Sequence, residues 1–266
     1  MSRIILILIF LFSLVTISEA KVYNMKEMMK AVVRVQSIGN YGSGTIFSES
    51  KTAYKIITNA HVVGESSLVS IDLFENGKHF KRVNGKVIWK QLDSNRSIDL
   101  AIVSINKEDL GDYTPNVIKL APSDTAVQKG SPVYSMGFPH ARWPMGWWGE
   151  ILESEDTLYF SPTPFAGQSG SAIFANIGEG EHRCTRIVGI IGWKTWEDKI
   201  LSSGKLGGYG IAMHISVLYD LMGDSDDETD RRNVKVRAKT REVGSWYWRN
   251  PFGVNIPQKV WVHSKY

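Results

Sequence analysis

The stretch AVVRVQSIGNYGSGTIFSESKTAYKIITNAHVV (31–63) contains three short runs rich in β-branched and aromatic residues, separated by glycine, asparagine and serine. Such runs, bounded by residues that favour turns, are typical of strands in an antiparallel sheet. The pattern continues, and further strands are expected at SLVSIDLF (67–74), RVNGKVIWKQL (82–92), DLAIVSI (99–105), SPVYSMGF (131–138), TLYFSPT (157–163), RIVGIIGW (186–193) and GYGIAMHI (208–215). Many strands at this spacing predict an all-β fold, either a sandwich or β-barrels.

The connections between these runs agree with that fold class. Glu75-Asn76-Gly77-Lys78 separates two expected strands and predicts a tight hairpin turn, because Asn-Gly adopts positive φ angles at little cost. No long amphipathic helix interrupts the strands. The first helical pattern is VLYDLM (217–222), which predicts a short helix near the C-terminal end of the domain.

The composition is that of a folded globular protein, since 43% of the 266 residues are hydrophobic and 22% are charged. It argues against a disordered chain, and the single long apolar run argues against a polytopic membrane protein. A formal net charge of +4 is too small to indicate nucleic acid as a partner. The single cysteine, Cys184, excludes an intrachain disulfide and a cysteine-based metal cluster.

Residues 1–20 have the organisation of a secretory signal peptide. Arg3 supplies a positive charge, an apolar run of 14 residues extends from Ile4 to Ile17, and Ala20 ends a small-residue cleavage site. The run is short for a membrane span, which needs about 20 residues. An uncleaved N-terminal membrane anchor is the alternative. In both cases the protein is expected outside the cytoplasm, secreted or periplasmic.

The remaining chain is divided into a domain at 21–222 and a tail at 223–266. In the tail, an acidic, turn-rich segment precedes the basic run RRNVKVRAKTR (231–241) and an aromatic stretch. We expect a linker followed by a strap that lays its aromatic rings on the domain. The alternative is a basic and aromatic surface that contacts a partner, an anionic lipid or a cell-wall polymer.

Three residues occupy settings that suggest nucleophilic catalysis. His61 ends the run IITNAH, Asp99 opens DLAIVSI, and Ser169 lies between glycines in GQSGS (167–171). A serine hydroxyl becomes a nucleophile when an imidazole takes its proton, and the imidazole needs a carboxylate that sets its tautomer and orientation. Each residue is ordinary alone. Together, in this order on an all-β pattern, they indicate a catalytic triad.

The glycine-rich turn meets a further requirement of that chemistry. The oxyanion that forms during acyl transfer needs backbone N–H donors, and a turn without Cβ atoms lets such donors converge. We therefore expect Gly167 and Ser169 to supply the two N–H groups of an oxyanion hole.

These segments resemble a known family. The trypsin-like serine proteases of the HtrA/Deg branch resemble this chain over most of residues 31–222, at TNAHVV (58–63), IDLAIV (98–103), KLAPSDTAVQKGSPVYSMGFP (119–139), GQSGSAIF (167–174), IVGIIGW (187–193) and GYGIAMHISVL (208–218). The resemblance implies two antiparallel six-stranded β-barrels with the site in the cleft between them. It also implies a serine endopeptidase that cleaves protein or peptide substrates through an acyl-enzyme, and residues 1–20 predict that this enzyme is secreted or periplasmic. His61 is then the general base, Asp99 its orienting carboxylate and Ser169 the nucleophile.

The chain departs from the family pattern in four places. Ser171 and Ala172 stand where the family has glycine and proline after the nucleophile. No Ile-Val-Gly-Gly-type activation site follows the signal peptide, and no PDZ domain is expected after Met222, where too few residues follow. These departures leave one alternative function, a catalytically inactive protease-like module that binds a protein or cell-envelope partner.

The same resemblance assigns the substrate-binding residues. Thr163 lies near the base of the specificity pocket, and Gly210 lines its opposite wall. Gly192 and Trp193 belong to the strand that pairs with the substrate backbone. Because no acidic residue falls at the base, we expect a neutral residue, small or apolar, before the scissile bond. No metal or cofactor is implied, because triad chemistry uses only side chains and backbone amides.

The segment RWPMGWW (142–148) contains three tryptophans. We expect a hairpin loop whose rings pack on the second barrel. The alternative is a substrate, membrane or envelope contact at the rim of the cleft.

Overall fold

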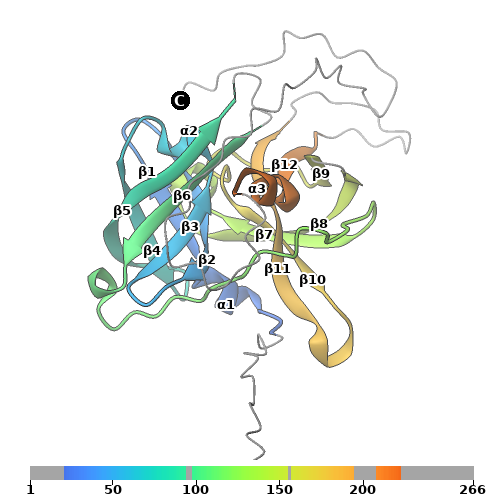
Figure 1. Cartoon of the computed structure of the whole chain (residues 1–266), viewed down its shortest axis with the longest axis horizontal. Coiled ribbons are helices and arrows are strands. Elements are labelled where there is room, and N and C mark those ends of the chain that lie inside the picture. Colours follow the sequence, from blue (N-terminus) through green and yellow to red (C-terminus); the bar gives the residue numbers. More distant parts are fainter. Residues whose placement is uncertain (1–20, 94–97, 155–156, 195–207, 223–266) are drawn as a thin grey trace, which may run out of the picture.

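The computed structural model describes residues 21–93, 98–154, 157–194 and 208–222. These form two closed β-barrels that contact each other through β1, β2 and β7, and Figure 1 shows the blue-to-green strands in one barrel and the green-to-orange strands in the other. The first barrel comprises β1 (Val32–Gln36), β2 (Tyr41–Glu49), β3 (Ala53–Thr58), β4 (Leu68–Glu75), β5 (Lys78–Leu92) and β6 (Asp99–Asn106). The second comprises β7 (Pro132–Gly137), β8 (Met145–Ser154), β9 (Thr157–Ser161), β10 (Ala172–Ile177), β11 (Cys184–Lys194) and β12 (Gly210–His214).

The two barrels share one strand order, although no sequence repeat is visible. Around the first barrel the order is β1-β2-β3-β6-β5-β4, and around the second it is β7-β8-β9-β12-β11-β10. The first strand of each barrel pairs with the fourth, which closes the barrel. This arrangement confirms the two antiparallel six-stranded barrels implied by the resemblance and excludes the sandwich.

Three short α-helices accompany the strands in the described ranges: α1 (Met25–Met29), α2 (Ala60–Val63) and α3 (Ile215–Met222). Short 3-10 helices lie at Glu108–Leu110, Pro139–Ala141 and Gly180–His182. Helix α3 confirms the short helix predicted near the C-terminal end of the domain. The described ranges contain no helix that is both long enough and apolar enough to span a membrane.

The hairpin turn between β4 and β5 is also confirmed. Asn76 has a φ of 50° and Gly77 a φ of 79°. Positive φ at both central residues is what a two-residue hairpin loop of this kind requires.

Strand β6 is buried on both faces, which explains its continuous apolar sequence. Ala101 and Val103 point into the core of the first barrel, whereas Leu100 and Ile102 belong to the core that continues into the second barrel. Successive side chains of a strand point to opposite faces, so a strand between two cores needs apolar residues at every position. Because β6 begins at Asp99, the packing of both cores positions that carboxylate.

The described chain begins against the second barrel. The N–H of Thr185 in β11 donates to the carbonyl of Lys21 at 2.9 Å, and the N–H of Tyr23 donates to Thr185 Oγ1 at 3.0 Å. The signal peptide predicted at 1–20 and the tail predicted at 223–266 lie outside the described residues, so the limits of the domain stay predictions.

Candidate active site

His61 lies on α2, the single helical turn between β3 and β4, and Asp99 is the first residue of β6. Strands β3 and β6 pair with Thr58 opposite Ala101, which brings the two side chains close together. The backbone N–H of His61 donates to Oδ1 of Asp99 at 2.9 Å, and Nδ1 of His61 lies 2.5 Å from Oδ2. Both carboxylate oxygens therefore hold the same histidine.

The Asp99 carboxylate sets the orientation of the imidazole. The Asp99 side chain is 1% exposed, whereas that of His61 is 34% exposed. Because Nδ1–H donates to a buried carboxylate, the lone pair on Nε2 remains available to accept a proton. Asn59 Nδ2 donates to the backbone carbonyl of Asp99 at 2.7 Å and so holds the start of β6 against α2.

Ser169 lies in the loop between β9 and β10, and β2 of the first barrel links it to the histidine. The N–H of Ser43 donates to the carbonyl of Ser169 at 2.8 Å. A Cβ on Gly42 would lie 2.5 Å from Cγ2 of Val62 and 2.8 Å from the carbonyl oxygen of Ser169. Gly42 therefore fits between the residue that follows His61 and the Ser169 backbone because it has no side chain. The structure thus pairs His61 with Asp99 and places the Ser169 backbone beside the strand that packs against the helix of His61.

The Ser169 hydroxyl is only weakly held. Its Oγ donates to the carbonyl of Gly192 in β11 at 3.4 Å, which exceeds the usual O–H···O range of about 2.5–3.0 Å. Within the described part of the chain, Ser169 has no hydrogen bond with His61. Catalytic hydrogen bonds are often long or absent without substrate, and a hydroxyl held this loosely is free to turn toward an imidazole.

Hydrogen bonds from other segments hold the two peptide planes on either side of Gly167. The carbonyl of Ala166 accepts a hydrogen bond from the N–H of His140 at 2.7 Å. The carbonyl of Gly167 accepts one from Oγ of Ser43 at 2.8 Å. The first bond sets the direction of the N–H of Gly167, because that N–H shares a planar peptide unit with the carbonyl of Ala166. The second bond holds the following peptide unit in place.

Position 167 requires glycine for two reasons. Its φ is 90°, a conformation that residues with a Cβ rarely adopt, and a Cβ there would lie 2.5 Å from the carbonyl oxygen of Phe138. Among the described residues, the N–H groups of Gly167 and Ser169 have no acceptor. Unpaired donors in one tight turn are suited to receive an oxyanion.

Ser43 is a residue of this site that sequence reasoning missed. It is fully buried, and its hydroxyl both donates to Gly167 and accepts a hydrogen bond from the N–H of Phe138 at 2.9 Å. Its carbonyl accepts a hydrogen bond from Thr58 Oγ1 at 2.7 Å. The available signal was a serine between two glycines inside an apolar strand, in GSGTIF (42–47).

The predicted substrate-binding residues Gly192 and Trp193 lie at an irregularity of β11. The register between β11 and β12 shifts between Ile191 and Trp193, and Trp193 pairs with Ile211. Gly192 therefore lies at a bulge, and its carbonyl is the acceptor for Ser169. Thr163 is half-buried in the loop that follows β9.

Gly210, the first residue of β12, lies against the ring of Phe160. A Cβ on Gly210 would overlap this ring. Phe160 is fully buried and stacks on Trp147, with ring centroids 5.2 Å apart and the planes at 5°. The wall that the resemblance assigned to Gly210 therefore borders an aromatic ring, which the strand pattern did not predict as part of the site.

The segment at 142–148 differs in part from the predicted hairpin loop, because β8 already begins at Met145. Trp147 packs on a core phenylalanine of the second barrel, as expected. Trp148 also lies against a ring of this barrel, that of Tyr134 in β7, with the centroids 4.7 Å apart, but 63% of it is exposed. Trp143 is 66% exposed.

Comparison with known proteins agrees with this geometry. The chain matches the trypsin-like peptidase domain over residues 42–181. A mutant of Rv3671c from M. tuberculosis H37Rv, in an inactive form, has a TM-score of 0.55 at 16% identity, covering 73% of this chain and 85% of that chain. The serine endoprotease from Yersinia pestis has a TM-score of 0.54 at 22% identity, covering 74% and 62%. The HtrA-type protease AlgW has a TM-score of 0.54 at 18% identity, covering 75% and 60%.

These structural likenesses concern the fold, since the sequence identities are low and the chain spans about three fifths of the last two proteins. No curated protein sequence matches the chain. The family match rests on the sequence itself, covers more than half of the 266 residues and includes His61, Asp99 and Ser169. The chain therefore belongs to the trypsin-like peptidase domain family, and by that membership it is a serine endopeptidase.

Proposed function

We propose that this protein hydrolyses peptide bonds with Ser169 as nucleophile, His61 as general base and Asp99 as the orienting carboxylate. The observation that carries the proposal is the pair of hydrogen bonds between His61 and the buried Asp99. A carboxylate bound to Nδ1 leaves Nε2 as the atom that takes the serine proton. The unpaired N–H groups of Gly167 and Ser169 support the same chemistry, because an anionic intermediate needs donors beside the nucleophile.

The reaction then proceeds in two halves. In the first, Ser169 Oγ bonds to the substrate carbonyl carbon while its proton passes to Nε2 of His61, and the oxyanion accepts hydrogen bonds from the N–H groups of Gly167 and Ser169. The C–N bond breaks, and His61 returns the proton to the leaving amine, which leaves an acyl-enzyme. In the second half, His61 removes a proton from water, the hydroxide adds to the acyl carbon, and Ser169 Oγ leaves with that proton.

The proposed substrate has a small, neutral residue before the scissile bond. Thr163 brings no charge to the assigned base of the pocket, and the ring of Phe160 occupies the space beside Gly210. A pocket shortened by a ring favours a small side chain over a large one. We expect peptides with Ala or Val at this position to be cleaved faster than peptides with Phe, Lys or Arg. A preference for Lys or Arg would contradict this assignment.

The proposed location is outside the cytoplasm, after cleavage of the signal peptide predicted at 1–20. The hydrogen bond from the N–H of Thr185 in β11 to the carbonyl of Lys21 supports cleavage there, because the residue directly after the expected cleavage site already contacts the second barrel. The exposed rings of Trp143 and Trp148 support a contact of this surface with the cell envelope.

Labelling with a fluorophosphonate tests the proposed nucleophile. The wild-type protein is expected to bind the probe covalently, and Ser169→Ala is expected to abolish labelling without loss of folding. Ser171→Ala is the matched control, because its hydroxyl has no hydrogen-bond partner in the described structure and lies in the same turn. Labelling that persists in Ser169→Ala, or a well-folded wild type that stays unlabelled, would contradict the proposal.

A further inference from the structure

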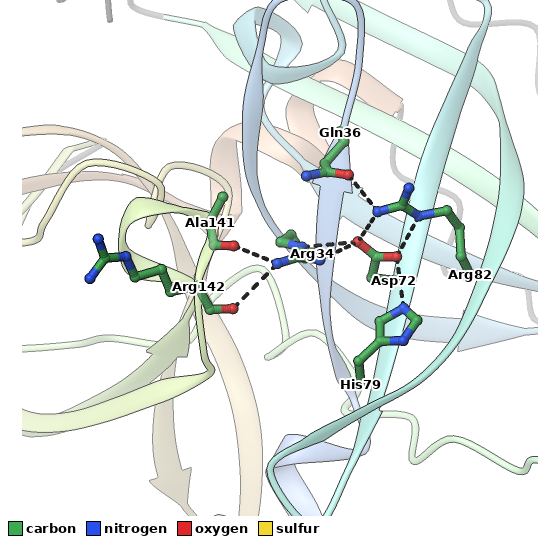
Figure 2. Close-up of polar contacts among 7 residues, drawn as sticks. All are labelled: Arg34, Gln36, Asp72, His79, Arg82, Ala141 and Arg142. Atoms are coloured by element: carbon green, nitrogen blue, oxygen red, sulfur yellow. Dashed lines mark hydrogen bonds and ion pairs between the residues drawn. The ribbon is translucent and has the colours of Figure 1, made fainter.

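A buried carboxylate in the first barrel gathers three basic side chains. Asp72, in β4, is fully buried and lies at the centre of the cluster shown in Figure 2. Arg34 Nε donates to its Oδ2 at 2.9 Å, and His79 Nε2 lies 3.0 Å from its Oδ1. Arg82 forms two hydrogen bonds with the carboxylate, at 2.7 and 3.0 Å, and a third with Oε1 of Gln36 at 2.9 Å.

Arg34 is the member of this cluster that reaches the second barrel. Its Nη1 donates to the carbonyl of Ala141, and the carbonyl of Arg142 lies 3.4 Å from the same nitrogen (Figure 2). The guanidinium also lies over the ring of Phe74, 5.5 Å from its centroid. The ring of Phe74 in turn packs against the ring of Phe138, and their centroids are 4.7 Å apart. The Arg34 side chain therefore contacts the backbone of the segment at 138–142 directly, and it contacts the first residue of that segment, Phe138, through the ring of Phe74.

That segment has a conformation that needs outside support. His140 has a φ of 52° and Ala141 a φ of 54°, both in the left-handed region. Residues with a Cβ are disfavoured there, and two in succession persist only when surrounding contacts hold them. The hydrogen bonds from Arg34 to the carbonyls of Ala141 and Arg142 are contacts of this kind.

The same segment determines the direction of an N–H group in the candidate active site. His140 donates its N–H to the carbonyl of Ala166 at 2.7 Å. In a trans peptide, the carbonyl of Ala166 and the N–H of Gly167 point in opposite directions. If the segment at 138–142 rotates and the hydrogen bond to the carbonyl of Ala166 breaks, the peptide unit can therefore rotate and the N–H of Gly167 then points away from the oxyanion.

We propose that Arg34, held by Asp72, is a positioning residue that orients the N–H of Gly167 through the segment at 138–142. The proposal rests on the proposed function, in which Gly167 donates to the oxyanion. Arg34 touches no reacting atom in this account. It links a buried charge in one barrel to an oxyanion donor that belongs to the other.

A matched pair of conservative variants tests the proposal. In Arg34→Lys a single ammonium keeps the charge beside Asp72 but cannot also reach the carbonyls of the segment at 138–142. Arg82→Lys is the control, since it makes the same change at a second arginine on Asp72, and the described contacts of Arg82 all lie within the first barrel.

We expect Arg34→Lys to lower the rate of fluorophosphonate labelling and the kcat for a peptide substrate by about tenfold or more, because loss of one oxyanion donor costs about 10²–10³ in kcat. The KM should change less than twofold. Arg82→Lys should change neither quantity more than twofold. Equal rates for the two variants would overturn the proposal.

Amide hydrogen exchange supplies a readout that does not depend on catalysis. In a Ser169→Ala background, which prevents self-digestion, Arg34→Lys should raise exchange at 138–142, including the N–H of His140, whereas Arg82→Lys should not. If wild-type protein shows no labelling that depends on Ser169, the proposed function fails, and exchange alone decides the coupling. Unchanged exchange in Arg34→Lys overturns the coupling in either case.

Discussion

Replacement of Asp72 by asparagine removes one negative charge from the buried cluster while nearly preserving its shape. The carboxylate oxygens accept hydrogen bonds from Arg34, Arg82 and His79. An amide retains only one oxygen as acceptor, and its NH₂ group faces donors. Asp72→Asn therefore leaves two guanidinium groups beside each other without a counter-charge, and we expect it to destabilise the folded protein.

The pKa of Asp72 supplies the magnitude and the pH dependence. Burial alone raises the pKa of this carboxyl, but hydrogen bonds from Arg82, Arg34 and His79, with the charge of Arg34, outweigh it and lower the pKa from 3.8 to about 2. At neutral pH this lowering corresponds to about 2 kcal/mol of folding free energy. Because the folded-state pKa lies below the unfolded-state value, the contribution is complete above that value and is lost as the pH falls toward 2. About half remains near pH 3.

Urea unfolding followed by tryptophan fluorescence measures this contribution, in a Ser169→Ala background that prevents self-digestion. At pH 7, Asp72→Asn should lower the free energy of unfolding by about 2–4 kcal/mol, the upper figure reflecting the unpaired arginines. The difference from wild type should narrow between pH 5 and pH 3. Asp124→Asn, at an exposed aspartate, is the control and should stay within about 0.5 kcal/mol. A loss below about 0.5 kcal/mol at pH 7, or a constant difference down to pH 3, would refute the reasoning.

Further predictions concern the site and the N-terminus. Gly170→Ala should abolish labelling and lower the melting temperature, because φ is 83° and a Cβ would overlap the carbonyl of Ser43 and the hydroxyl of Thr58; normal labelling and melting would show that the turn relaxes. N-terminal sequencing of protein secreted by its host should begin at Lys21, and a chain that keeps its first residues indicates an uncleaved anchor.

Much of the fold and the candidate triad could be predicted from sequence because the signals are local. The unbroken apolar run in DLAIVSI (99–105) predicts a strand that is buried on both faces, and Asp99 is its first residue. GQSGS (167–171) combines a hydroxyl with the glycines that a tight turn of donors needs. In these segments, burial of a strand and formation of a tight turn depend on residues that are neighbours in the sequence, so the sequence alone is enough to predict them.

Contacts between distant segments could not be predicted in this way. Ser43 and Gly167 are 124 residues apart in sequence, and Arg34 and Ala141 are 107 apart. Nothing in the composition of either segment indicates its partner. The sequence also did not reveal that the two barrels share one strand order. Two barrels can pair their strands in the same order when their buried positions have similar spacing, even if the residues at those positions differ.

By itself, the sequence determined which residue types carry the chemistry and which segments become strands, because hydrophobic alternation, turn residues and the flanking glycines act over a few neighbouring positions. Only the tertiary structure decided how Asp99 meets His61 and in which direction the N–H of Gly167 points. Those orientations depend on hydrogen bonds between segments that are far apart in the sequence, within the first barrel for His61 and Asp99 and within the second for His140 and Ala166. Such bonds exist only after each barrel has closed, since closure brings the segments within hydrogen-bonding distance.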